Sequence, residues 1–142
     1  MHRSQQGLSL IELLLVISLV MILGTASAPL LSQFLLYNNF DLTAQKVVGS
    51  LRKAQNYSIT HRLGQNWGVC VYGNAVRIYA GSCGSPSFHQ DTPLEPNITV
   101  SGVSNIVFNR RGEPSAPVTV TVTSSIESVS YTLNSAGRIS QP

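Results

Sequence analysis

The feature that most constrains the fold of this chain is an uncharged stretch near its N-terminus. Residues 13–40 contain no Asp, Glu, Lys or Arg. The apolar part that starts at Leu8 is long enough to cross a bilayer, which requires about 20 residues. Charged residues make up 11% of the 142-residue chain, against roughly 25% in soluble domains. The shortage is local, so we expect one apolar element followed by one small polar domain.

Two simple interpretations of residues 1–36 conflict with Glu12. A secretory signal peptide would use Arg3 as its basic start and residues 26–28 (Ala-Ser-Ala) as its cleavage site. A plain transmembrane anchor would use residues 8–31. Glu12 lies inside the apolar run, where a carboxylate opposes insertion by up to about 3 kcal/mol. Neither a signal peptide nor an anchor requires it.

A third interpretation accounts for the carboxylate. Residues 6–14, with the sequence QGLSLIELL, resemble the class III signal of type IV prepilins. That pattern has a short basic leader, a Gly, a hydrophobic first mature residue, a small hydroxyl residue and a Glu at the fifth mature position. Gly7, Leu8, Ser9 and Glu12 stand in these places. Leu8 differs from the commoner Phe or Met.

The resemblance implies a maturation pathway. A prepilin peptidase would cut between Gly7 and Leu8 at the cytoplasmic face and methylate the new Leu8 amine. Glu12 would then pair with the N-terminal amine of a neighbouring pilin, because a buried carboxylate needs a partner. The chain would be a substrate and not an enzyme, without cofactor or metal. It would lie in inner-membrane lipid as a single-pass protein with a periplasmic domain, and later in a pilus or pseudopilus.

Beyond the apolar run the periodicity stays helical. Apolar residues recur at helical spacing from Phe40 to Ser58, with polar residues between them. We therefore expect one helix from Leu8 to about His61, with Gly24 and Pro29 as interruptions that kink or locally unwind it. The expected divisions are a leader (1–7), a membrane and filament-core helix (8–36), an amphipathic half-helix (37–62) and a β-rich domain (63–142).

From Asn66 onward the periodicity of the apolar residues changes from about 3.6, typical of a helix, to two, typical of a strand. Strands are expected at residues 67–72 and 75–80 around a Gly-Asn hairpin turn, and at 97–101, 106–109, 117–123 and 128–133. The fold class is therefore α+β. With the prepilin resemblance it is the type IV pilin fold, a long N-terminal helix on antiparallel sheets.

The two cysteines, Cys70 and Cys83, are expected to bracket this hairpin. In an exported domain they can pair, and a loop of that size makes such a disulfide worth about 3 kcal/mol. Two cysteines with His89 nearby are too few ligands for a metal site. No nucleophile motif or phosphate loop supports an enzyme.

The C-terminal tail resembles minor pilins of the GspH/FimT group. It has an aromatic-ending strand at 106–108, a Gly turn, two more strands and a closing Gly-Arg. The first hypothesis is a structural subunit of a type IV pilus or type II secretion pseudopilus. The alternative is a FimT-like DNA-binding subunit that uses Arg110, Arg111 and Arg138 on phosphates. Two features argue against DNA binding. Ser140 stands where the FimT-type tail carries a second basic residue, and the net charge of the chain is only +3.

Overall fold

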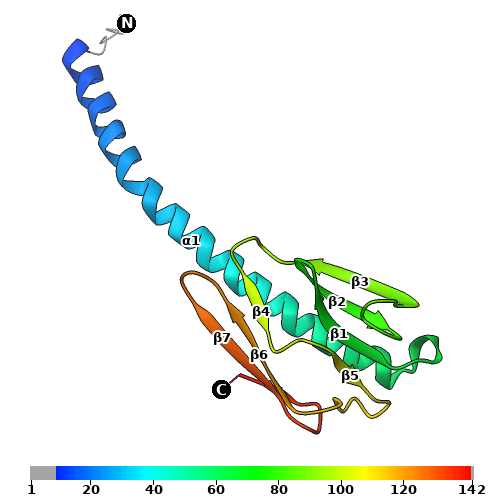
Figure 1. Cartoon of the computed structure of the whole chain (residues 1–142). Helices are drawn as coiled ribbons and strands as arrows, with labels where there is room; N and C mark the ends of the chain where they lie inside the picture. Colours follow the sequence, from blue (N-terminus) through cyan, green and yellow to red (C-terminus); the bar gives the residue numbers. More distant parts are fainter. Residues whose placement is uncertain (1–8, 142) are drawn as a thin grey trace, which may run out of the picture. The chain divides into compact units, whose positions relative to one another are not determined.

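The computed structural model describes residues 9–141, with the side chains of residues 25–30 left unplaced (Figure 1). The chain divides into two compact units, Met1–Leu36 and Tyr37–Pro142. One helix, α1 (Leu10–Ile59), contributes to both and is followed by a short 3-10 turn, η1 (Arg62–Gly64). The expected long helix is therefore confirmed, and it ends within two residues of the predicted position.

Helix α1 runs unbroken through Gly24 and Pro29. The local unwinding suggested for Pro29 is thus not found in the described backbone. A proline removes a single backbone hydrogen bond, and the turns on either side of Pro29 keep theirs as α-helix. Within the part of the chain that the structure describes, no helix is long and apolar enough to cross a membrane.

In the second unit, one face of α1 packs into the hydrophobic core. The residues Phe40, Ala44, Val47, Leu51 and Ala54 follow helical spacing and are all buried. Ser58 continues this face but is polar, and its hydroxyl is hydrogen-bonded. It accepts from the Trp67 N–H at 2.7 Å and donates to the Phe108 carbonyl at 3.0 Å. This contact fixes the end of the helix against two strands.

Within residues 9–141, eight strands form two antiparallel four-stranded sheets (Figure 1). The first sheet has the order β3-β2-β1-β5 and the second β4-β6-β7-β8. Their bounds are β1 (Trp67–Tyr72), β2 (Ala75–Ala80), β3 (Phe88–Pro93), β4 (Thr99–Ser101), β5 (Ile106–Phe108), β6 (Val118–Thr123), β7 (Ser128–Leu133) and β8 (Ile139–Ser140). Both sheets contribute to one hydrophobic cluster with α1.

The predicted hairpin is confirmed in register. Strands β1 and β2 pair from Trp67↔Ala80 to Tyr72↔Ala75, and Gly73 in the turn has a φ of 59°. This left-handed conformation suits a two-residue hairpin turn. Four further strands lie within the predicted ranges, with β4 and β5 shorter than expected.

Two strands were not predicted. Strand β3 has the sequence FHQDTP and is almost wholly exposed, so it lacks the apolar alternation by which strands are recognised. It forms because it pairs with β2 along six residues. Strand β8 has two residues and pairs with the end of β7. Both are edge strands whose existence depends on a neighbour.

Candidate functional site

The N-terminal candidate residues lie at the start of α1. The carbonyl of Ser9 accepts hydrogen bonds from the backbone N–H groups of Glu12 (3.0 Å) and Leu13 (3.1 Å). Glu12 is the acidic residue of the first helical turn, where the helix dipole stabilises a negative charge. Its side chain is exposed, and no ion pair to it is found among the described residues. Gly7 and Leu8, the predicted cleavage and methylation residues, lie outside the described residues.

The first unit presents an apolar surface. Every side chain described between residues 10 and 24, and between 31 and 36, is exposed, and most are Leu, Ile or Val. Exposed apolar patches of this extent mark contacts with another protein or a lipid phase. The described part of the chain has nothing that covers this surface.

The second candidate region is built from two turns of the same design. In residues 109–113, the Asn109 Oδ1 accepts from the N–H groups of Arg111 (2.8 Å) and Glu113 (3.0 Å). The Gly112 N–H donates to the Asn109 carbonyl at 3.0 Å, and Gly112 has a φ of 78°. An Asn side chain that bonds the backbone ahead of it stabilises this type of turn.

Residues 134–138 repeat the design after β7. The Asn134 Oδ1 accepts from the Arg138 N–H at 2.8 Å, the Gly137 N–H donates to the Asn134 carbonyl at 2.9 Å, and Gly137 has a φ of 79°. Both segments read Asn-x-x-Gly, and each carries at least one arginine.

Gln55 on α1 holds the two turns together. Its Nε2 donates to the Gly112 carbonyl at 2.8 Å and to the Gly137 carbonyl at 2.9 Å. The turns also touch each other, since a Cβ on Gly137 would lie 2.1 Å from the Gly112 oxygen. The structure therefore places Arg138 beside the turn that carries Arg110 and Arg111, although they are far apart in sequence.

The three arginines are not equivalent. The Arg110 Nε donates to Nδ1 of His61 at 3.2 Å, and its Nη2 contacts the other ring nitrogen. Arg110, Arg111 and Arg138 are all exposed. Glu113 lies in the first turn and accepts from the Asn109 Nδ2 at 2.7 Å. A shallow depression of about 470 Å³ is lined by Asn66, Asn109, Arg110, Arg111 and Glu113.

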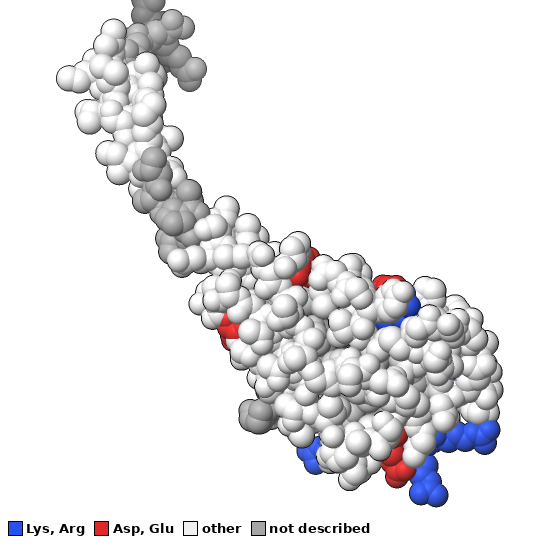
Figure 2. All heavy atoms as spheres, in the orientation of Figure 1, with Lys and Arg blue, Asp and Glu red and all other residues white. Residues whose placement is uncertain are grey.

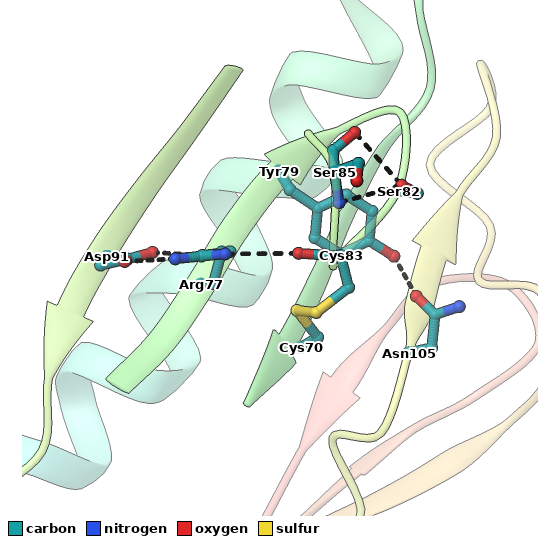
Figure 3. Close-up of a disulfide and its surroundings, with 8 residues drawn as sticks. All are labelled: Cys70, Arg77, Tyr79, Ser82, Cys83, Ser85, Asp91 and Asn105. Carbon is teal, nitrogen blue, oxygen red and sulfur yellow. Dashed lines mark hydrogen bonds and ion pairs between the residues drawn. A yellow bond between two sulfur atoms is a disulfide. The ribbon is translucent and has the colours of Figure 1, made fainter. Parts of the chain in front are cut away.

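The disulfide predicted from the sequence is present (Figure 3). Cys70 on β1 is joined to Cys83 in the loop after β2, with Cα atoms 6.3 Å apart. Arg77, opposite Cys70 in the β1–β2 pairing, donates from Nη1 to the Cys83 carbonyl at 3.3 Å. The disulfide and Arg77 therefore fix the same loop over one face of the first sheet.

Arg77 also ties β2 to the exposed strand β3. Its Nε and Nη2 donate to the two carboxylate oxygens of Asp91 at 2.7 and 2.8 Å. The hydrogen bond from Arg77 lowers the pKa of Asp91 below its usual value, and the same bond raises the pKa of Arg77. Beside it, Tyr79 donates to the Asn105 side chain (Figure 3), and burial raises the pKa of the Tyr79 hydroxyl.

Sequence reasoning missed Gln55 and His61 as partners of the arginine turns. The repeated Asn-x-x-Gly pattern at 109–112 and 134–137 was available as a signal for two similar turns. Nothing in the sequence indicated that one glutamine bonds both, because that contact spans 57 residues to Gly112 and 82 to Gly137.

Comparisons with known proteins agree with the N-terminal motif and with the fold. Residues 2–28 match the prokaryotic N-terminal methylation motif, and residues 43–137 match the family described as type II transport protein GspH. No curated protein matches the sequence. The fold is similar to that of the minor pseudopilin EpsH from the type 2 secretion system of Vibrio cholerae. The TM-score is 0.55 and the identity 14%, over 72% of this chain and 94% of EpsH.

The methylation motif, the long helix and the two antiparallel sheets together define a type IV pilin-like protein. At this identity the likeness to EpsH concerns the fold. The family match covers most of the chain. The chain belongs to the GspH family of type II transport proteins, and the sequence-based resemblance to that group is confirmed.

Proposed function

We propose that this type II transport protein acts as a minor pseudopilin whose N-terminal helix is the assembly element. The observation that carries the proposal is the exposed apolar surface of α1 at residues 10–24 and 31–36. Burying apolar surface provides roughly 25 cal/mol per Å², so a helix exposed on all sides gains strongly from packing against other helices of its kind. Other pilins or pseudopilins are therefore the partners.

Processing by prepilin peptidase belongs to the same proposal. The peptidase cuts between Gly7 and Leu8 and methylates Leu8, which leaves Glu12 as the fifth mature residue. Support comes from the methylation motif over residues 2–28 and from a Glu12 side chain that is exposed. In the filament Glu12 pairs with the N-terminal amine of a neighbour, which fixes the axial position of the two helices.

Before assembly the chain resides in the inner membrane with its β-rich domain in the periplasm. Support comes from the uncharged residues 13–40 and from a disulfide, which persists in oxidising compartments. The support for this membrane step comes from the sequence and the family. In the described part of the chain, no helix meets the requirements for a membrane span.

Two measurements test the assembly role. Intact-mass analysis of filament material should show loss of residues 1–7 and one added methyl group on Leu8. Glu12→Ala should still be processed, because the cut lies five residues earlier, and its incorporation into filaments should fall. Gln33→Ala, a polar change further along the same helix, is the control. An unprocessed Met1 in assembled material, or normal incorporation of Glu12→Ala, would contradict the proposal.

A second candidate function is DNA binding in the manner of FimT-like subunits. The observation that favours it is the Gln55 contact, because it brings Arg138 beside Arg110 and Arg111. Three phosphate contacts predict a slope of log affinity against log salt of about −2.7. Replacement of the three arginines by Ala should flatten that slope. A purely structural subunit shows no binding of the full chain to duplex DNA at physiological salt, with or without the replacements.

A further inference from the structure

The outer face of the first sheet carries a buried arginine. Along β2 the side chains that belong to the hydrophobic core are Val76, Ile78 and Ala80. Because side chains alternate along a strand, Arg77 and Tyr79 point to the opposite face of the sheet. Arg77 is nevertheless 8% exposed and Tyr79 1% exposed, whereas Figure 2 shows basic atoms that project into solvent at the lower edge of the unit. A further segment of the chain must therefore cover this face.

The cover is the 81–87 loop between β2 and β3. Cys83 in this loop is joined to Cys70 on β1, and the Arg77 Nη1 donates to the Cys83 carbonyl at 3.3 Å. Figure 3 shows the Arg77 guanidinium bonded to this carbonyl on one side and to Asp91 on the other. The disulfide thus fastens the loop on the face where the guanidinium is buried.

The loop has few other ties to the sheet. Its sequence, GSCGSPS, contains no large apolar side chain that could anchor it. A Cβ at Gly84 would have no neighbour within 4 Å, so the tip of the loop stands clear of other residues. Among the described contacts, residues 82–86 are held to the sheet by the disulfide and by the Arg77 hydrogen bond. Cleavage of the disulfide therefore leaves a single hydrogen bond to hold them.

The two sulfur atoms of the disulfide differ in access. Cys70 is 0% exposed, while Cys83 is partly exposed. Disulfides exchange when a thiolate attacks one of the sulfurs, and access helps to decide which sulfur is attacked. An external thiolate therefore attacks Cys83, and Cys70 is the sulfur that leaves.

The residues opposite Cys70 favour this direction of attack. Cys70, Arg77 and Asp91 face one another across β1, β2 and β3. Directly opposed residues have Cβ atoms about 5 Å apart, so the Arg77 side chain is one strand closer to Cys70 than the Asp91 side chain is. When the loop leaves, the Arg77 Nη1 loses the Cys83 carbonyl and can donate to a thiolate on Cys70. A cation beside a sulfur favours its thiolate, and a sulfur that is stable as a thiolate leaves faster.

The other ionisable groups around Arg77 lie on the same three strands. The guanidinium carbon is 3.8 Å from the centre of the Tyr72 ring. On β3, the pKa of Asp91 is lowered chiefly by its hydrogen bond from Arg77 and in addition by the charge of His89. Burial raises the pKa of the Tyr79 hydroxyl. Of these groups, Asp91 carries the negative charge near neutral pH, and it lies on the far side of Arg77 from the disulfide.

We propose that Cys70–Cys83 is an exchangeable disulfide that fastens the 81–87 loop over the first sheet, and that its reaction partner is a dithiol. A thiolate of the dithiol attacks the Cys83 sulfur, the S–S bond breaks, and its electron pair leaves on the Cys70 sulfur. The second thiolate of the dithiol then displaces Cys83 from the mixed disulfide. Two electrons and two protons pass from the dithiol to the chain, and the dithiol becomes a disulfide.

In the reduced chain the loop opens and uncovers Arg77, while the strands stay paired. A disulfide that served only as a staple would require neither an accessible sulfur on Cys83 nor a cation opposite Cys70. Filament assembly through the N-terminal helix does not depend on this reaction.

Trapping of the mixed disulfide tests the order of attack. The full chain in detergent is treated with glutathione, quenched with N-ethylmaleimide and mapped by mass spectrometry. Glutathione should be found on Cys83 and maleimide on Cys70. Glutathione on Cys70, or on both cysteines equally, would overturn the proposal.

Hydrogen exchange locates the part of the chain that opens. With dithiothreitol, amide exchange should become faster in the 81–87 loop, and β1 and β2 should keep their protection. Faster exchange throughout both sheets would show that the disulfide is a staple of the whole fold. Unchanged exchange in the loop would show that the disulfide does not hold it. Either result would overturn the proposal.

The contribution of Arg77 is tested by the rate at which dithiothreitol reduces the disulfide. If the guanidinium stabilises the leaving Cys70 thiolate, Arg77→Gln should slow the reduction, and Arg77→Lys, which keeps the charge, should restore the rate. If Arg77 only clamps the loop, Arg77→Gln should loosen the loop and make reduction faster.

Asp91→Asn is the control for these rates, because it removes the ion pair of Arg77 and retains the cation, so reduction should not become slower. Faster or unchanged reduction of Arg77→Gln would overturn the role given to Arg77. The trapping and exchange measurements use the wild-type chain, so they decide the proposal even where a variant fails to fold.

Discussion

The Nε2 of Gln55 lies 2.8 Å from the carbonyl oxygen of Gly112 and makes a hydrogen bond between the last turns of α1 and an arginine-bearing turn. The same nitrogen donates to the Gly137 carbonyl. A single side chain therefore joins α1 to the turn after β5 and to the turn after β7. This contact determines where three arginines lie, although it involves none of them.

Gln55→Ala should destabilise the fold by about 1–3 kcal/mol, because two carbonyl groups lose a partly buried donor. Gln45→Ala is a matched control on the same helix, since the Gln45 amide bonds an exposed neighbour, Asp41, and should change stability by less than about 0.5 kcal/mol. Denaturant unfolding of the full chain in detergent measures both. Equal effects would mean that the Gln55 contact adds nothing to stability.

Gly137→Ala should cost at least about 1–2 kcal/mol, the usual penalty for a left-handed residue with a side chain. Its φ is 79°, and the new Cβ would lie 2.1 Å from the backbone oxygen of Gly112. Gly84→Ala is the control, because its Cβ would have no neighbour within 4 Å. Comparable melting temperatures for the two variants would show that the turns are not in contact as described.

Reduction of the Cys70–Cys83 disulfide should lower the stability of the domain by about 3 kcal/mol, the value for a loop of this size. The double substitution to Ser should have the same effect and should be insensitive to reductant. Thermal unfolding with and without reductant, alongside maleimide labelling of unreduced protein, measures this. Labelling of both cysteines before reduction would contradict the pairing.

The Arg77–Asp91 pair should make stability depend on pH. The pKa of Asp91 is lowered in the folded chain, so its contribution is complete above the unfolded value of 3.8 and is lost as pH falls through the lower folded value. The stability difference between wild type and Asp91→Asn should therefore be constant near neutral pH and shrink below about pH 4. Glu95→Gln, at an exposed position without such a bond, is the control. A difference that grows on acidification would contradict this sign.

Much of the fold could be predicted because its signals are local. The β1–β2 hairpin follows from the Gly-Asn turn and the alternation on either side, and its register is as expected. The amphipathic half of α1 follows from spacing alone. Strand β3 could not be predicted, because its polar residues form a strand only through pairing with β2 and the Arg77–Asp91 bond.

The sequence by itself determined the N-terminal motif, the long helix, the α+β class and the two cysteines that pair, since each depends on neighbouring residues or on composition. Tertiary structure alone decided which turns meet. Asn109 and Asn134 build their turns locally, but only the packing of α1 brings Gln55 to both carbonyls. Contacts between residues far apart in sequence depend on the path of the whole chain, and no local pattern encodes that path.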